Sequence, residues 1–310
     1  MKIALLFFGQ PRELDKCYIN IFNDLIRGYD VDIYAHLWWH PEMSNTSFHQ
    51  NAPHIEEKNK NRNFFENSDT LFKELYEPKK VIFEKPWDYE SFNFKPYREA
   101  IEKGTDNPIS KFGVMGYNIN DFKAGHVSRL DKHIYNELSQ WYSVKKAFSL
   151  IEKDEYDFYI KFRTDLAIQK KIQYEKLQKD TLYISTGLVF GGVGGFLKSK
   201  LPLSDLAACG NRENMSIYCS FYDHYKDYIE LPIHLQQELY LMVHNDIECD
   251  LSVMKCLPYW MFQKNKFKWE NYEKENERRY QAEFSLKNRS LRKKRSPSKP
   301  SRGFNQDNII

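Results

Sequence analysis

The sequence predicts an α/β fold in which helices flank a mostly parallel sheet. Residues 1–37 carry a strand–turn–helix–strand pattern, the usual connection between two parallel strands. Residues 134–162 add a long helix that leads into a strongly alternating strand. Hydrophobic residues make up 41% of the 310-residue chain and aromatic residues 16%, which is enough for one core.

The first unit begins with the apolar strand KIALLFF, residues 2–8, which the turn Gly9-Gln10-Pro11-Arg12 follows. Apolar residues then recur at helical spacing as far as Ile26, Gly28 is a plausible stop, and residues 31–37 form the second strand. The turn lies at the carboxyl end of a strand, so it should line the ligand crevice of an open sheet. Arg12 is the residue there that can meet a phosphate, or it is an ordinary surface arginine.

Two histidines and two tryptophans close the second strand, namely His36, Trp38, Trp39 and His40. The histidines invite a metal site, but no third ligand lies nearby at a familiar spacing. The alternatives are a planar ligand stacked on a tryptophan and plain core packing.

The middle of the chain is less regular. A polar loop leads into a short helix around residues 64–76, and residues 80–84 form a third strand. Residues 86–125 are rich in Pro, Gly and aromatic residues, which predicts an ordered but irregular insertion rather than a linker. Such segments often carry substrate loops.

The alternating segment 156–162 ends in Arg163-Thr164-Asp165. A carboxylate and a guanidinium at the carboxyl end of a buried strand are typical of a binding site in an α/β sheet. The alternative is a solvated ion pair. If this strand end is the active centre, Asp165→Ala should abolish activity and change the stability by no more than about 0.5 kcal/mol.

Beyond this strand the sequence predicts a strand at residues 182–185, helices over 212–227 and 233–244, and a strand at 248–254. The glycine-rich segment 187–196 does not match the dinucleotide fingerprint G-x-G-x-x-G. The phosphate-loop motif G-x-x-x-x-G-K-[ST] is absent from the sequence, which disfavours a P-loop enzyme.

Charge is unevenly distributed along the chain. Residues 287–310 hold eight basic residues and one acid, a net +7, so the remaining residues carry −4 of the total of +3. The Lys, Arg, Ser and Pro content of residues 287–303 predicts disorder. The five cysteines form no C-x-x-C pair, which favours reduced thiols, and no apolar run is long enough to span a membrane. We expect a soluble, cytoplasmic protein.

Several segments, taken in order, resemble bacterial and viral glycosyltransferase-like proteins of capsule, lipopolysaccharide and other surface-glycan synthesis. The matching segments are GQPR at 9–12, YDVDIYAHLWW at 29–39, YDFYIKFRTDL at 156–166, SDLAACGNRENMSIY at 204–218 and QQELYLMV at 236–243. The resemblance covers roughly residues 1–250.

This resemblance implies a GT-A-like fold, a Rossmann-type sheet that binds a nucleotide sugar. It places donor binding at Gly9, Gln10, Arg12, Arg163 and Asp165. Many such enzymes hold Mn²⁺ or Mg²⁺ with an Asp-x-Asp strand end, where Asp165 matches the second acid and arginine replaces the first. Asp165 is therefore the expected metal ligand, whereas Arg163 can neutralise the diphosphate directly.

Asp205 and Glu238 are the candidate catalytic acids, as base or acceptor ligand. The alternatives are a capping aspartate and an exposed helix glutamate, and retention or inversion stays open. We expect a glycosyltransferase domain over residues 1–265 and a charged extension over 266–310.

The implied reaction is sugar transfer to a glycan or lipid-linked acceptor. A non-catalytic relative that binds nucleotide sugars is one alternative. Another is a protein that acts through its basic tail, residues 287–302, on an anionic membrane or on nucleic acid. Nucleic acid is the less favoured partner, because the rest of the chain is net acidic and carries no recognition motif.

Overall fold

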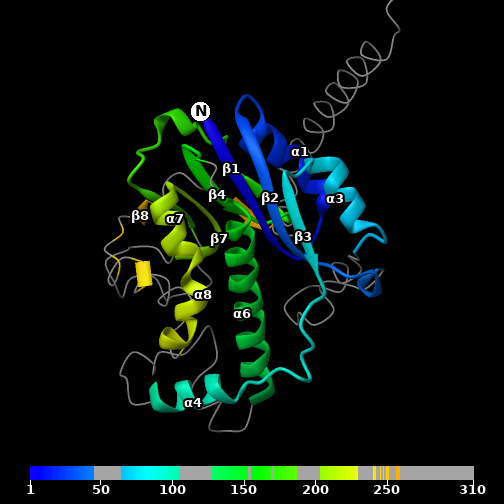
Figure 1. Ribbon diagram of the computed structural model, residues 1–310, viewed down its shortest axis with the longest axis vertical. Coiled ribbons are helices and arrows are strands. Elements are labelled where there is room, and N and C mark those ends of the chain that lie inside the picture. The colour runs from blue at the N-terminus through cyan, green and yellow to red at the C-terminus, as the bar shows by residue number, and fades with distance from the viewer. Residues whose placement is uncertain are drawn as a thin grey trace, which may run out of the picture. The chain divides into compact units, whose positions relative to one another are not determined.

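The computed structural model describes residues 1–44, 64–104, 127–152, 155–168, 171–186 and 203–229, with residues 240–241, 245, 247, 249–250 and 256–258. All of them belong to one compact unit, Met1–Lys264, and Figure 1 labels most of its elements. The segment 187–196, most of the predicted helix 233–244, Glu238 and the basic tail lie outside the described residues. The boundary near residue 265 and the disorder of the tail stay predictions.

A seven-stranded sheet in the order β3-β2-β1-β4-β7-β6-β8 forms the centre of the unit. Its strands are β1 (Lys2–Gly9), β2 (Asp30–Trp38), β3 (Lys80–Glu84), β4 (Phe158–Phe162), β6 (Leu182–Thr186), β7 (Leu203–Gly210) and β8 (Cys249–Asp250). The pairs β1–β2, β1–β4, β2–β3 and β6–β8 are parallel, whereas β7 runs antiparallel to β4 and β6. The sheet is therefore mostly parallel, as predicted.

Strand β1 is the central element of the parallel part. Residues Ile3–Phe8 are all buried, because β2 and β4 pair with β1 on either side and helices cover both faces. In the register Gly9 faces Leu37 of β2, and Phe7 faces Phe162 of β4. The carboxyl ends of the three strands consequently meet at one edge of the sheet.

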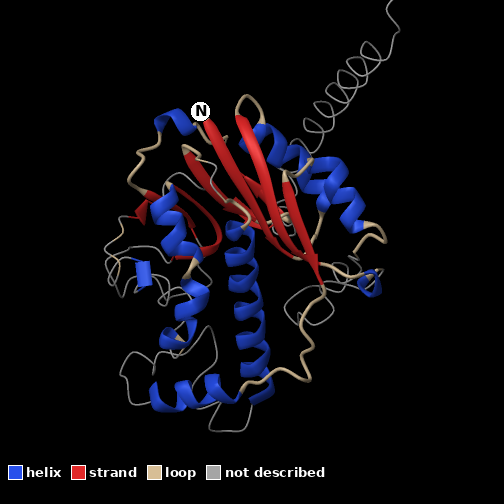
Figure 2. Cartoon of the chain, in the orientation of Figure 1, coloured by secondary structure: helices blue, strands red, loops and turns tan. Residues whose placement is uncertain are grey.

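Alternate residues of β1 pack on different helices. Phe7 contacts Phe72 and Tyr76, from the side covered by α1 (Leu14–Ile21) and α3 (Ser68–Tyr76). Ala4, Leu6 and Phe8 belong to a second core, which also contains residues of the long helix α6 (Val127–Ser149). Figure 2 shows these helices flanking the sheet. This arrangement confirms the α/β class and is consistent with a GT-A-like fold.

Several elements differ from the prediction. Helix α4 (Lys95–Gly104) forms inside the segment 86–125 that we expected to be irregular, because Tyr97 and Ile101 share a face that packs on the core. The predicted helix 212–227 is divided into α7 (Arg212–Cys219), α8 (Phe221–His224) and a 3₁₀ turn, Tyr225–Tyr228. A π-helical turn, Phe22–Ile26, extends α1.

Three further strands have no counterpart in the prediction. Strand β7 was not expected, and β5 (Leu166–Ile168) pairs with β9 (Cys256–Pro258) in a separate two-stranded sheet. The buried cysteines Cys17, Cys209 and Cys219 are free thiols. Among the described helices, we find none with both the length and the apolar character needed to cross a membrane.

Candidate active site

The turn after β1 contains two residues with left-handed backbone conformations. Gly9 has φ +84° and Glu13, the N-cap of α1, has φ +50°. Glycine adopts this conformation easily, whereas for a glutamate it is strained, and such strain tends to occur at functional sites. The Gly9 amide donates a hydrogen bond to Ser143 Oγ of α6 at 2.8 Å, which fixes the start of the turn.

Hydrogen bonds connect the same turn to the residues that follow β4. The Arg12 amide donates to Thr164 Oγ1 at 3.1 Å, and the Thr164 hydroxyl donates to the Gln10 carbonyl at 3.2 Å. Thr164 is fully buried. The structure thus brings together the two segments, 9–12 and 163–165, that the sequence singled out.

Arg163 and Asp165 form a bidentate ion pair at this strand end. Arg163 donates from Nε to Asp165 Oδ1 at 2.8 Å and from Nη2 to Oδ2 at 2.6 Å. The Asp165 side chain is only 7% exposed, so the pair is not the solvated one that we considered. Burial by itself would raise the pKa of Asp165, but the charge and hydrogen bonds of Arg163, together with the charge of Arg12 and a backbone hydrogen bond, outweigh it, and the pKa lies below its usual value.

Arg12 adds a second guanidinium beside this pair. It donates from Nε to Gln10 Oε1 at 2.8 Å, and its Nη2 contacts the same oxygen. Burial lowers the pKa of Arg12 to about 10, with Asp165 acting in the opposite direction and Arg163 adding to the lowering. Arg12 remains charged at neutral pH, and the two guanidinium groups lie close enough to repel each other.

A cavity of about 330 Å³ opens next to these residues. It is lined by Phe8, Gly9, Gln10, Arg12, Trp38, Pro86, Trp87, Tyr135, Asn136, Ser139, Gln140 and Arg163. These residues come from the carboxyl ends of β1, β2 and β4, from the segment after β3 and from one side of α6. The cavity therefore occupies the position where ligands bind in open α/β sheets.

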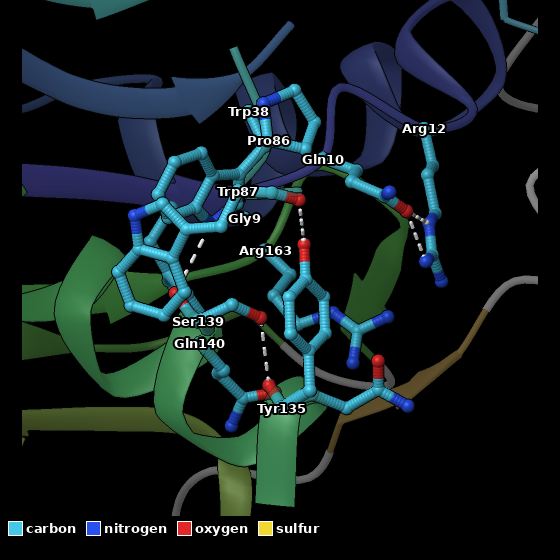
Figure 3. A pocket seen from close by; sticks show the side chains of 12 residues that line it. Gly9, Gln10, Arg12, Trp38, Pro86, Trp87, Tyr135, Ser139, Gln140 and Arg163 are labelled. Carbon is cyan, nitrogen blue, oxygen red and sulfur yellow. Dashed lines mark hydrogen bonds between the residues drawn. The ribbon is translucent and has the colours of Figure 1, made fainter. Parts of the chain in front are cut away.

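Aromatic side chains form the end of the cavity away from Arg12. The Trp38 and Trp87 rings lie 5.3 Å apart, and Trp38 stacks on Tyr142 of α6 at 5.4 Å. The Trp38 indole N–H donates to the Ser139 carbonyl at 3.0 Å, and the Tyr135 hydroxyl donates to the Trp87 carbonyl. In the view of Figure 3 the tryptophans lie at one end, Arg12 at the other and Arg163 between them.

The two histidines of the second strand have different environments. His36 is fully buried, with Nδ1 2.9 Å from Ser143 Oγ and Nε2 2.9 Å from Glu84 Oε2. Burial lowers the pKa of His36, although Glu84 opposes this. His40 lies near the surface beside Glu42, 3.4 Å away. Within the described parts of the chain, no group of three His, Cys, Asp or Glu side chains is placed to hold a metal ion.

Asp205 lies in β7, next to the cavity wall, and is not the capping residue that we considered. Gln140, which lines the cavity, donates to Asp205 Oδ2 at 2.6 Å. The buried Lys161 ammonium donates to the Asp205 carbonyl and contacts the Phe8 ring at 4.3 Å. Asp205 is thus one side chain away from the cavity, whereas Glu238 cannot be placed because it lies outside the described residues.

The α6 side of the cavity was missed in the sequence analysis. Asn136, Ser139, Gln140 and Ser143 follow one another at intervals of three, one and three residues, so they form a polar stripe on the helix. This stripe borders the apolar face that contains Leu138, Trp141 and Val144. A polar stripe beside a buried face, on a helix that covers a strand end, is the signal that could have identified these residues.

The described residues do not fit a divalent cation well as they are arranged. Both oxygens of Asp165 already accept hydrogen bonds from Arg163. None of the described residues that line the cavity carries a carboxylate, whereas two carry guanidinium groups. A cation at Asp165 would have to displace Arg163, so the predicted metal role of Asp165 has no support from this geometry.

Comparisons with known proteins find similar chains among solved structures. No family model matches the chain, and no curated protein sequence matches it. Among solved structures, the chain is similar to mouse xyloside xylosyltransferase 1 in its apo form, with 12% sequence identity and a TM-score of 0.33 over 81% of this chain and 85% of that one. A likeness of this degree assigns no activity to the chain.

Proposed function

We propose that this chain is a glycosyltransferase that transfers a sugar from a nucleotide-sugar donor. The observation that carries the proposal is the cavity at the carboxyl ends of the parallel strands, with two guanidinium groups near one end and two tryptophans at the other. Guanidinium groups bind phosphate oxygens, and aromatic rings stack on planar bases or on sugar rings. A nucleotide sugar combines these chemical groups in one molecule.

The proposed roles follow from the position of each residue. Arg12 and Arg163 contact the diphosphate, while Gly9 and Gln10 shape the turn beneath it. Trp38 and Trp87 contact the nucleoside or the sugar. In the transfer step the bond between the anomeric carbon and the diphosphate oxygen breaks, and its electron pair stays on the diphosphate. The added negative charge is then stabilised by the arginines.

The acceptor hydroxyl forms the new bond to the anomeric carbon and must lose its proton. In a transfer with inversion, a carboxylate on the acceptor side takes this proton. Asp205 is our candidate base because it is bonded to Gln140 in the cavity wall, and Glu238 is the second candidate. The proposed acceptor is a glycan or a lipid-linked sugar of surface polysaccharide synthesis, which rests on the resemblance noted for the sequence.

Titration calorimetry of the purified full-length chain with UDP-, GDP- and CMP-sugars tests the proposal. We expect one nucleotide class to bind, and Arg12→Ala to weaken that binding. The absence of binding to every nucleotide sugar, with and without Mn²⁺, would contradict it. Binding without turnover on any matched acceptor would favour the non-catalytic alternative.

For the basic segment 287–302 we propose weak attraction to an anionic membrane near lipid-linked acceptors. Each basic residue close to such a surface contributes about 1 kcal/mol. Binding of full-length protein to anionic vesicles and to DNA should be compared with that of a chain ending at Leu286. Loss of vesicle binding on truncation is expected, and unchanged binding would contradict the proposal.

A further inference from the structure

The arrangement of charges at the cavity has a consequence for how a diphosphate is bound. The side chains of Arg12 and Arg163 both line the cavity, and the bonds between Thr164 and the 10–12 turn hold their backbones together. Asp165 receives two hydrogen bonds from Arg163 and is itself absent from the described cavity lining. The carboxylate thus lies behind the guanidinium rather than in the cavity.

We infer that Arg12 and Arg163 bind the diphosphate without a bridging divalent cation, and that Asp165 is a positioning residue that orients Arg163. This inference rests on the proposed function and specifies how its donor is held. A guanidinium carries several N–H donors in a rigid plane, so pairing with Asp165 along one edge is compatible with binding phosphate oxygens along another. The fixed plane presets the direction of those donors.

The electrostatics of the cavity lining favour an anion. The described cavity lining includes the guanidinium groups of Arg12 and Arg163 and no carboxylate, since Asp165 and Glu13, which both act on the pKa of Arg12, are not part of that lining. The pKa of Arg12 is lowered first by burial and also by the charge of Arg163. A diphosphate between the two guanidinium groups would replace this repulsion by attraction, which explains why two arginines are tolerated side by side.

Inorganic pyrophosphate is a suitable probe because it tests the anion site independently of any sugar or base. We expect titration calorimetry in the presence of EDTA to detect pyrophosphate binding to the wild-type chain. Arg163→Lys, which keeps the charge but loses the planar fork, should weaken that binding by about 10-fold or more. Binding that appears only when Mn²⁺ replaces EDTA would overturn the inference.

A double-mutant cycle separates the positioning role of Asp165 from a merely structural one. Asp165→Asn should weaken pyrophosphate binding when Arg163 is present, because the guanidinium loses a charged partner that orients it. In an Arg163→Ala background the same substitution should leave binding unchanged or strengthen it, since it removes a negative charge near the anion. Equal losses in the two backgrounds would contradict the positioning role.

The chain offers a matched control in a second bidentate pair. Arg98 donates from Nε to Asp131 Oδ1 at 2.8 Å and contacts Oδ2 through Nη2, and neither residue is part of the described cavity lining. Arg98→Lys and Asp131→Asn should leave pyrophosphate affinity unchanged. An equal effect at this pair would mean that the losses at Arg163 reflect general destabilisation, which would overturn the inference.

The same titrations distinguish failure of this inference from failure of the proposed function. Pyrophosphate binding in EDTA, with no binding of any nucleotide sugar, would contradict the glycosyltransferase proposal and leave the arginine site intact. Nucleotide-sugar binding that strictly requires Mn²⁺ would contradict the cation-free arginine site and leave the glycosyltransferase proposal intact. Thermal unfolding of each variant shows whether it is folded, and Arg12→Lys replaces Arg163→Lys if the latter does not fold.

Discussion

The Arg12 amide donates a hydrogen bond to the Thr164 side chain, 152 residues later in the sequence, at a distance of 3.1 Å. The Thr164 hydroxyl in turn donates a hydrogen bond to the Gln10 carbonyl. One buried side chain therefore joins the turn after β1 to the strand end that carries Arg163 and Asp165.

Thr164→Val should separate these two segments while keeping the shape of the side chain. The Arg12 amide would lose one of its two acceptors and keep the Gln10 carbonyl at 2.9 Å, so we expect a loss of about 0.5–1.5 kcal/mol in the free energy of unfolding, measured by urea denaturation. Donor affinity should fall as well. Thr164→Ser keeps the hydroxyl and should retain most of both properties, and an equally severe effect of serine would argue against this role of the hydroxyl.

Gly9→Ala should reduce both stability and donor affinity. Gly9 has φ +84°, and a methyl group there would meet nothing within 4 Å, so the cost is conformational and about 1–2 kcal/mol. Gly28, at φ +88°, is the matched control because it is not part of the described cavity lining. Chemical denaturation should show similar losses for both variants, and calorimetry should show weaker donor binding only for Gly9→Ala. Weaker binding in both would contradict the assignment of Gly9 to the site.

Trp38→Phe should weaken donor binding by about 3- to 10-fold, on the basis that an aromatic contact is worth about 0.5–1.5 kcal/mol. Trp39→Phe is the control, because Trp39 is equally buried but packs on Phe64 rather than lining the described cavity. Titration calorimetry of both variants with the donor measures the two affinities. If Trp39→Phe weakened binding as much as Trp38→Phe, the tryptophan end of the cavity would not be a ligand contact.

The burial of His36 predicts a pH-dependent stability. Its native pKa lies below the usual 6.5, so the unfolded chain takes up a proton at a higher pH than the folded chain. The contribution of His36 is thus fully present above about pH 6.5 and is lost as the pH falls from 6.5 through the native pKa. Urea denaturation at pH 7.5 and 5.5 measures this slope.

His36→Asn should remove the His36 part of that slope. His40→Asn, at the partly exposed neighbouring histidine, should keep it because His36 is unchanged. A wild-type slope that persists in His36→Asn would show that other groups cause the pH dependence.

Much of the fold was predictable because its signals are local. The apolar run of β1 and the alternation before Arg163 are properties of single segments, and the rule that parallel strands share an edge then brought residues 9–12 and 163–165 together. β7 was not predictable in this way. Its sequence, LSDLAACG, is poor in β-branched and aromatic residues, and it becomes a strand through pairing with β4 and β6.

The candidate site was predictable only in part, because tertiary packing rather than local sequence signals brings some of its residues together. Trp87 and Gln140 join it through tertiary packing of the segment after β3 and of α6.

The expectation that Asp165→Ala would lower the free energy of unfolding by no more than about 0.5 kcal/mol also does not fit the structure. Asp165 is buried and accepts two hydrogen bonds from Arg163, so its removal should cost about 1–3 kcal/mol. A strand end is not necessarily exposed when a neighbouring turn covers it.

The most direct test of the central claim is a crystal structure of the full-length chain with a nucleoside diphosphate bound. We expect phosphate oxygens within about 2.7–3.2 Å of guanidinium nitrogens of both Arg12 and Arg163. We also expect the Arg163–Asp165 pair to be intact and the nucleoside to extend towards Trp38 and Trp87. A diphosphate bound away from the two arginines, or held through a cation on Asp165 with Arg163 displaced, would contradict it.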